Sequence, residues 1–203
     1  MAISLEKGKK VNLQKTQNSG LGEILVNLNW NTKPAKQGFF AGLMGSKNSG
    51  GIDLDLGCLF ELKNGRKGAV QALGNAFGSL QREPYIALDG DDRTGAVTTG
   101  ENLRINGDRI AEIQRVLVYT YIYEGVANWK QADAVVTIRY PGAEDLVVKM
   151  DDYNSPKIMC GLVLLENIND ETFSVEKIVQ FYQGHRDLDE AFHWGLSWTA
   201  GRK

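Results

Sequence analysis

The sequence contains few cysteines, few prolines and no long apolar run. Its two cysteines, Cys58 and Cys160, lie far apart inside apolar stretches and away from both histidines, so we expect buried free thiols and neither a disulfide framework nor a zinc site. No segment approaches the roughly 20 apolar residues of a membrane-spanning helix. The N-terminal segment lacks the apolar core of a signal peptide, which predicts a cytoplasmic protein.

The chain also lacks a large net charge of either sign. The chain has 23 basic and 25 acidic residues, giving a net charge of -2, so no global field would attract nucleic acid or an anionic membrane. The apolar content of 42% and the charged content of 24% are ordinary for a folded protein, and a chain of 203 residues suits one domain covering residues 1–203. Any function that depends on charge must therefore be local.

Alternation of apolar and polar residues, by contrast, recurs along the chain. In residues 23–30, Ile24, Val26 and Leu28 fall on one side of a predicted strand, and residues 51–62, 133–140 and 172–182 alternate in the same way. Residues 116–123 and 158–166 are almost continuously apolar, which is typical of central strands that are covered on both faces. These short strands, separated by turn-forming residues, predict an all-β protein: an antiparallel β-sandwich with one or two short peripheral helices.

Helical spacing is scarce in this chain. Apolar residues recur at helical intervals and predict a short helix in residues 70–80: Val70, Leu73, Phe77 and Leu80. Residues 187–198 open with acidic residues and predict a final helix, on which Trp194 and Trp198 would form a packing pair. The glycine-rich residues 33–51 predict a long loop folded onto the sandwich, with a binding lid or a partner-docking tip as the alternative.

Two carboxylates on one predicted strand suggest a cation site. Asp53 and Asp55 are two positions apart, so their side chains leave the same face of the strand about 6.6 Å apart, at about 3.3 Å per residue. Like charges at this separation repel, and a divalent cation between them would remove the repulsion. Carboxylate oxygens suit Ca²⁺ or Mg²⁺ better than zinc or copper.

An acidic, glycine-containing loop follows in residues 85–105, "YIALDGDDRTGAVTTGENLRI". Calcium takes about six to eight oxygen ligands, which this loop could supply from carboxylates and inward-turned carbonyls; its acidic residues are Asp89, Asp91, Asp92 and Glu101. The loop is not an EF-hand, because counting from Asp89 places Arg93, Thr94 and Gly100 at key positions of that motif. Since Asp and Gly are common turn formers, a turn in which Arg93 pairs with an aspartate is the alternative.

Several segments, taken together and in order, resemble the TerD-type family of tellurium-resistance and stress-response proteins. They are "LEKGKKVNLQK", "VNLNWN", "GIDLDLGCLFEL", "DDRTG" and "GENLRI". The ending "DLDEAFHWGLSWTAGRK" makes the chain similar to the TerA-like branch of that family. The resemblance covers most of the chain, and its specificity lies in the combination of the DLD strand with the DxRTG loop.

This resemblance implies a β-sandwich that binds calcium at an acidic cluster, is associated with resistance to tellurite and other chemical stresses, and has no established catalytic activity. Matched by position, the family's calcium ligands would be Asp53, Asp55, Asp91, Asp92 and Glu101, with Asp89 and the carbonyls of Arg93 and Gly95 as further candidates. The sequence departs from the family pattern where "AVTTGEN" replaces a denser acidic run and where Asn31 replaces an aspartate. Fewer carboxylates imply weaker binding, one ion in place of two, or none.

The resulting hypothesis is a non-enzymatic calcium-binding stress-response protein whose partners are the calcium ion and other tellurium-resistance proteins. One alternative is a metal-independent protein-interaction scaffold of the same resistance system. A second is a glycoside hydrolase that uses paired carboxylates, which is disfavoured because Asp53 and Asp55 share one strand face. Membrane contact is expected only through a partner or a calcium bridge, with Phe39 and Phe40 inserting, and nucleic-acid binding is not expected.

Overall fold

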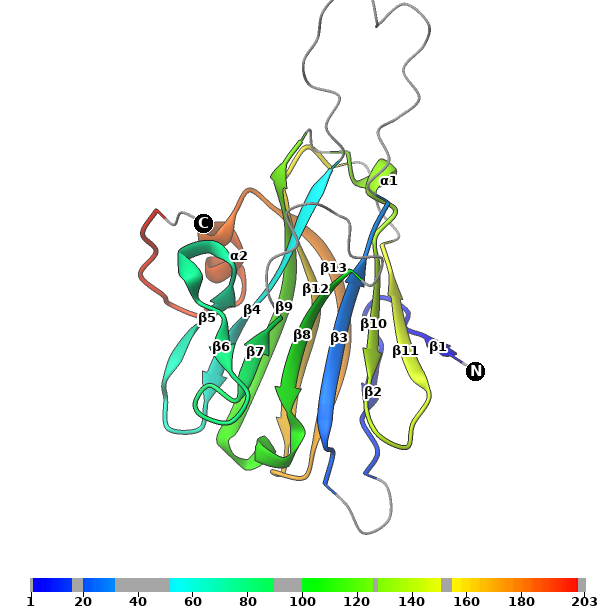
Figure 1. Ribbon diagram of the computed structural model, residues 1–203, viewed down its shortest axis with the longest axis vertical. Helices are drawn as coiled ribbons and strands as arrows, with labels where there is room; N and C mark the ends of the chain where they lie inside the picture. The colour runs from blue at the N-terminus through cyan, green and yellow to red at the C-terminus, as the bar shows by residue number, and fades with distance from the viewer. Residues whose placement is uncertain are drawn as a thin grey trace, which may run out of the picture.

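Two twisted β-sheets packed face to face make up the molecule (Figure 1). The computed structural model describes residues 2–15, 20–31, 52–89, 100–125, 128–150 and 155–200. The predicted loop at 33–51 lies outside these residues. No helix in the described part of the chain is long and apolar enough to cross a membrane.

The strands form a seven-stranded and a six-stranded sheet. In spatial order, the seven-stranded sheet contains β1 (Ala2–Ser4), β11 (Asp145–Lys149), β10 (Val135–Arg139), β3 (Glu23–Asn29), β8 (Glu101–Asn106), β7 (Ile86–Leu88) and β6 (Gly78–Ser79). The six-stranded sheet contains β2 (Lys10–Asn12), β13 (Thr172–Tyr182), β12 (Met159–Ile168), β9 (Ile113–Glu124), β4 (Asp53–Leu62) and β5 (Lys67–Gln71). Among the described strands, β1 pairs with β11 in parallel and the other pairings are antiparallel, so the predicted antiparallel sandwich is confirmed.

The core between the sheets follows the alternation in the sequence. Ile24, Val26 and Leu28 of β3 are fully buried, and they belong to the same apolar cluster as Leu54 and Leu56 of β4. Both cysteines are buried free thiols, as predicted. The prediction of central strands covered on both faces is also confirmed. Strands β9 and β12 lie inside the six-stranded sheet, and both contribute residues to the apolar cluster between the sheets and to a second cluster.

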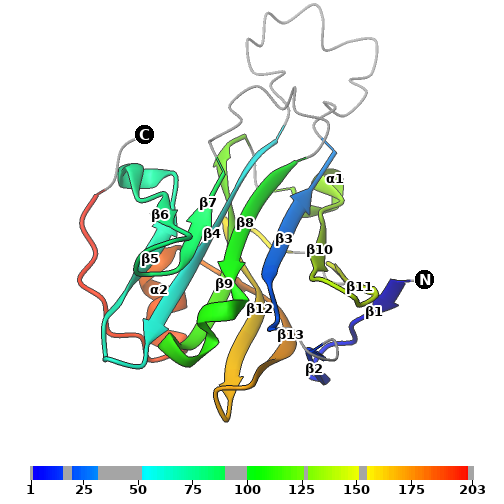
Figure 2. The same ribbon diagram turned by 60° about the horizontal axis from the view of Figure 1, so that its bottom comes forward.

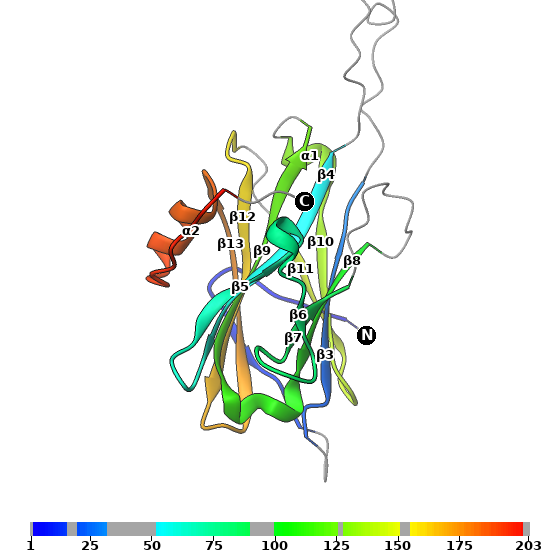
Figure 3. The same ribbon diagram turned by 60° about the vertical axis from the view of Figure 1, so that its left-hand side comes forward.

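A C-terminal helix covers the outer face of the six-stranded sheet. Helix α2 (His185–Ala191) lies on the side of this sheet opposite the seven-stranded one (Figure 3). A second apolar cluster, which contains Leu117, Leu188 and Trp194, fills the space beneath it. The other helices in the described residues are α1 (Trp129–Ala132) and short 3-10 helices at Leu73–Asn75 and Gly107–Glu112.

The predicted helix at residues 70–80 is wrong. This segment contains the end of β5, the 3-10 helix at Leu73–Asn75 and strand β6. Its two glycines explain the failure, since Gly74 and Gly78 both have positive φ angles, of 74° and 73°. A β-carbon at Gly78 would also overlap the Ile86 carbonyl oxygen, so close approach to β7 requires glycine here.

The predicted C-terminal helix is confirmed, but it is shorter than the pattern suggested. Helix α2 ends at Ala191, and His193 and Gly195 then adopt positive φ angles of 54° and 76°. Trp194 and Trp198 therefore lie beyond the helix, and the prediction that they pair on it is wrong. Trp194 is buried against the six-stranded sheet, where its indole N–H donates to the Phe60 carbonyl at 3.0 Å.

Candidate metal centre

The predicted carboxylates that the structure describes gather at one end of the sandwich. Asp53 and Asp55 open β4, Glu101 opens β8, and Asp89 directly follows β7. Figure 2 shows this end of the molecule, where the start of β4 and the end of β3 approach α1. Asp91, Asp92, Arg93 and Gly95 lie outside the described residues.

Glu101 connects the two sheets. Its side chain points inward from β8 with Leu103 and Ile105 and is only 4% exposed. Carboxylate Oε2 accepts a hydrogen bond of 2.5 Å from the backbone N–H of Leu56 in β4. The register of β4 with β5 ends at Gly57 and Gln71, so among the described strands Leu56 has no strand partner on this edge, and Glu101 satisfies its donor.

Asp55 lies on the opposite, outer face of β4 and is fully buried. Its backbone carbonyl accepts a 2.9 Å hydrogen bond from the Thr120 hydroxyl, while Tyr121 of β9 stands directly opposite it in the strand register. Burial first, and then proximity to the Asp55 carboxylate, raises the pKa of the Tyr121 hydroxyl well above its ordinary value. Both the Tyr121 hydroxyl and the Oδ2 atom of Asp55 are buried here.

Asp53 shares the outer face of β4 with Asp55, as the two-residue spacing predicts, and is half-buried. A register irregularity separates Asp53, opposite Glu124, from Leu54, opposite Ile122. A bulge of this kind bends a strand and redirects its side chains. The extra residue in this register is Tyr123, so the bulge belongs to β9, the strand that faces the start of β4.

Asp89 occupies the outer face of the seven-stranded sheet, away from Glu101. Both of its carboxylate oxygens accept hydrogen bonds of 2.8 Å from the Arg104 guanidinium, and Arg104 also pairs with Glu23. The hydrogen bonds from Arg104 lower the pKa of Asp89. The aspartate that the sequence offered as a further ligand is held by an arginine in this structure.

The oxygen donors at this end of the sandwich are chemically suited to a hard divalent cation. The buried Asp55 side chain leaves the outer face of β4, and the buried Glu101 side chain contacts the same stretch of β4 from the other sheet. Both carboxylates contribute to raising the pKa of Tyr121. Over residues 2–15, 20–31, 52–89, 100–125, 128–150 and 155–200, however, no three His, Cys, Asp or Glu side chains come together as a metal site. The described residues alone therefore do not make up a complete metal site.

Several residues around Asp55 were not anticipated from the sequence. Tyr119 and Tyr121 share the outer face of β9, and His185 of α2 lies edge-on to both rings, with centroids 5.5 and 5.2 Å away. Gln71 accepts hydrogen bonds at its Oε1 from the Tyr119 hydroxyl at 2.5 Å and from His185 Nε2 at 2.9 Å. Residues 116–123 were predicted only as an almost continuously apolar central strand, and the position of Tyr121 opposite Asp55 and of Tyr119 opposite Gly57 depends on strand register.

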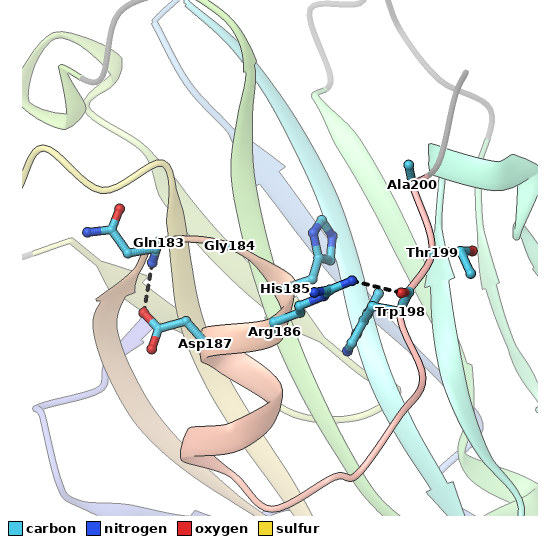
Figure 4. Close-up of a pocket in the computed structure, with 8 residues that line it drawn as sticks. All are labelled: Gln183, Gly184, His185, Arg186, Asp187, Trp198, Thr199 and Ala200. Atoms are coloured by element: carbon cyan, nitrogen blue, oxygen red, sulfur yellow. Dashed lines mark hydrogen bonds between the residues drawn. The ribbon is translucent and has the colours of Figure 1, made fainter.

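A cavity of about 520 Å³ opens beside His185 (Figure 4). It lies between the start of α2 and residues 198–200, and none of the predicted calcium ligands lines it. Within it, the Arg186 guanidinium donates to the Trp198 carbonyl at 3.1 Å, and the Asp187 carboxylate accepts from the Gln183 N–H at 2.9 Å. The first contact ties Trp198 to α2, and the second lies at the start of the helix.

Solved structures share this sandwich. A homologue of telluride resistance protein (TerD), SCO6318 from Streptomyces coelicolor A3(2), superposes with a TM-score of 0.57 at 18% identity, covering 84% of this chain and 95% of its own. A protein of unknown function, SAV2460, superposes with a TM-score of 0.58 at 14% identity, covering 82% of this chain and 92% of its own. The fold is thus that of a TerD-like β-sandwich.

Sequence comparison gives the family. The TerD domain model matches residues 1–140, which include every predicted metal ligand and end before β12, β13 and α2. The chain is 42% identical over 202 residues to tellurium resistance protein TerA from Alcaligenes sp., and 33% identical over 129 residues to stress response protein SCP2 from Bacillus subtilis (strain 168). The chain belongs to the TerD domain family of tellurium-resistance and stress-response proteins.

The alignments cover only part of each relative. The alignment to TerA covers 99% of this chain but 58% of TerA, and the alignment to SCP2 covers 62% of this chain and 63% of SCP2. Tellurium resistance protein TerX from Serratia marcescens is 30% identical over 142 residues, covering 62% of this chain and 64% of TerX. The chain therefore spans about 60% of the length of each of these relatives.

Proposed function

We propose that the chain is a non-enzymatic calcium-binding module that acts in a stress response of the tellurium-resistance type. The observation that carries this proposal is the burial of two carboxylates, those of Asp55 and Glu101, against the two faces of one short stretch of β4. Its biological setting is inferred from the family, in which the relatives carry names of tellurium resistance and stress response.

Burial of two ionised carboxylates is unfavourable unless cations or hydrogen-bond donors compensate their charge. Glu101 receives the Leu56 N–H, and a calcium ion would supply the larger compensation to both carboxylates. Asp53, on the same strand face as Asp55, is a third candidate donor. The remaining oxygens would come from Asp91, Asp92 and the carbonyls of Arg93 and Gly95.

The chain's own residues would hold the ion and order this end of the sandwich. Glu101 already fixes β4 against β8, and Thr120 fixes the carbonyl of Asp55. Bound calcium would add a charged bridge between the two sheets at the point where β5 ends. The role of the ion in this proposal is conformational: it couples the acidic end of the fold to calcium concentration.

A calorimetric calcium titration of the full chain and its variants tests the proposal. We expect calcium to bind wild type, and Asp55→Asn and Asp91→Asn each to abolish the binding heat. The matched control is Asp145→Asn, which also removes one carboxylate charge, but in an exposed ion pair with Arg139 on the outer face of the other sheet. Wild-type affinity in both Asp55→Asn and Asp91→Asn would overturn the site assignment.

A metal-independent interaction module is the second candidate function. It is favoured by the pair between Asp89 and Arg104, which shows that at least one carboxylate at this end of the molecule is held by an arginine. Under this alternative, the partners would be other proteins of the same resistance system. Absence of calcium binding by wild type, in the titration above, would favour it.

A further inference from the structure

A continuous set of contacts leads from Asp55 to the C-terminal segment, defined here as residues 183–200. The first contact is across strands. Asp55 of β4 stands opposite Tyr121 of β9, and Gly57 stands opposite Tyr119. Directly opposed residues on a sheet face have Cβ atoms about 4.5–5.5 Å apart. The absence of a side chain at Gly57 lets the Tyr119 ring lie over β4, since a β-carbon there would be 2.8 Å from the ring.

His185, the first residue of α2, makes the second contact. Its ring meets Tyr119 at 88° and Tyr121 at 63°, both edge arrangements that aromatic rings favour. The shared acceptor Gln71 fixes the orientation of His185 and Tyr119 together. The start of the helix is therefore positioned by Tyr119 and by Tyr121, the residue opposite Asp55.

Trp198 makes the third contact. The centroid of its ring lies 4.8 Å from that of His185, and both residues belong to the C-terminal segment. The indole N–H of Trp198 donates to the Asp189 carboxylate at 3.0 Å. The same carboxylate accepts the N–H groups of Gly195 at 2.8 Å and Leu196 at 3.0 Å, so it holds the whole turn that follows α2.

We propose that Tyr121 positions the Asp55 carboxylate for cation binding, and that docking of the C-terminal segment through His185 and Trp198 holds Tyr121 in place. This inference rests on the proposed calcium site and adds a means of regulating it. Groups that orient a metal ligand contribute to metal affinity although they do not touch the metal. Linkage also requires reciprocity: if the docked segment strengthens calcium binding, calcium must strengthen docking by the same factor.

Tyr121→Phe and His185→Ala test whether the two residues contribute to calcium affinity. Tyr121→Phe removes only a hydroxyl and keeps the ring, so it is the milder change. We expect each variant to raise the calcium dissociation constant about tenfold in calorimetry with calcium chloride. His193→Asn is the matched control, because His193 is exposed and asparagine tolerates its positive φ angle; its dissociation constant should stay within about twofold of wild type.

Hydrogen exchange followed by mass spectrometry tests the reciprocal effect, in which calcium strengthens docking of the C-terminal segment. In wild type, calcium should slow amide exchange in residues 183–200 relative to EDTA, with Gly195 and Leu196 as the reporting amides. Tyr121→Phe should lose most of this calcium effect. A purely structural role for Tyr121 would change exchange in EDTA but leave the difference between EDTA and calcium unaltered.

The outcomes separate this inference from the calcium proposal. If wild type binds calcium while both variants bind as wild type does and exchange in residues 183–200 ignores calcium, the coupling is overturned and the calcium site stands. If wild type binds no calcium, the proposed function is overturned and the coupling with it. Weakened binding in both variants, together with calcium-slowed exchange in wild type, supports the inference.

Discussion

The carboxylate of Glu101 in one sheet accepts the backbone N–H of Leu56 in the other, at 2.5 Å. This hydrogen bond joins the two acidic motifs of the sequence, since Leu56 directly follows the DLD strand residues and Glu101 closes the DDRTG loop. It also satisfies a donor that the end of β5 leaves without a strand partner in the described part of the sheet. Glu101 thus has a structural role that is separable from the proposed binding of a cation.

Substitutions at Glu101 should separate these two roles. Glu101→Gln keeps an oxygen that accepts the Leu56 N–H but removes the charge, so its melting temperature in EDTA should stay near that of wild type while its stabilisation by calcium is lost. Glu101→Ala leaves the buried donor unsatisfied and should lower the free energy of unfolding by about 1–3 kcal/mol in EDTA as well. Thermal unfolding of both variants, with and without calcium, measures the difference. Full calcium stabilisation of Glu101→Gln would remove Glu101 from the site.

Gly100→Ala should destabilise the acidic end of the fold. Gly100 has a φ of 69°, and a β-carbon there would overlap the Leu28 carbonyl oxygen. Because backbone and not a flexible side chain blocks the space, we expect a loss of about 1–3 kcal/mol in the free energy of unfolding. Urea unfolding monitored by tryptophan fluorescence would measure it. An unchanged midpoint would show that the turn before β8 adjusts without cost.

Asp89→Asn should affect calcium binding much less than Asp55→Asn. The Asp89 carboxylate lies on the outer face of the seven-stranded sheet and is occupied by Arg104, whereas Asp55 is buried on β4. Loss of this partly exposed ion pair should cost no more than about 1 kcal/mol of stability. Parallel calcium titrations of the two variants provide the comparison. If Asp89→Asn abolished binding while Asp55→Asn did not, the ligand assignment would be reversed.

Stability in EDTA should fall between about pH 6.5 and pH 4 through His185. Burial lowers the pKa of His185 from 6.5 to about 4 in the folded protein. In that window the unfolded chain binds a proton that the folded chain does not, so acidification favours unfolding, and above the window the effect is absent. His185→Gln removes this contribution, so the melting temperatures of wild type and variant should converge on acidification. A difference that does not change with pH would contradict the neutral, buried imidazole.

Alternation predicted most of the sandwich because period two reports directly which residues face the core. It identified the inward side of β3 and β4, while continuous apolar runs identified the doubly covered strands β9 and β12. Helical spacing of apolar side chains gave the wrong prediction at residues 70–80, where it coincided with glycines that adopt positive φ angles. The acidic opening of residues 187–198 predicted too long a helix, because Asp189 accepts the N–H groups of Gly195 and Leu196 and so stabilises a turn in place of further helix.

Only part of the candidate site could be predicted from the sequence. Spacing alone placed Asp53 and Asp55 on one strand face, while the association of Glu101 with them came from the acidic composition of its loop and from the family resemblance. Contacts between distant segments were not predictable, since the pairing of Asp89 with Arg104 and of Asp55 with Tyr121 depends on strand register. The position of His185 over Tyr121 likewise requires the path of the chain after β13.

Thermal unfolding of the purified chain in excess EDTA, in calcium and in magnesium tests the central claim most directly. A ligand that binds only the folded state stabilises it by about 2.7 kcal/mol at a hundredfold excess over its dissociation constant. We expect a clear rise in melting temperature with calcium and a much smaller one with magnesium, because magnesium demands a stricter octahedral geometry and gives up its water reluctantly. Identical melting temperatures in EDTA and in saturating calcium would contradict the proposal that Asp55 and Glu101 form part of a calcium site.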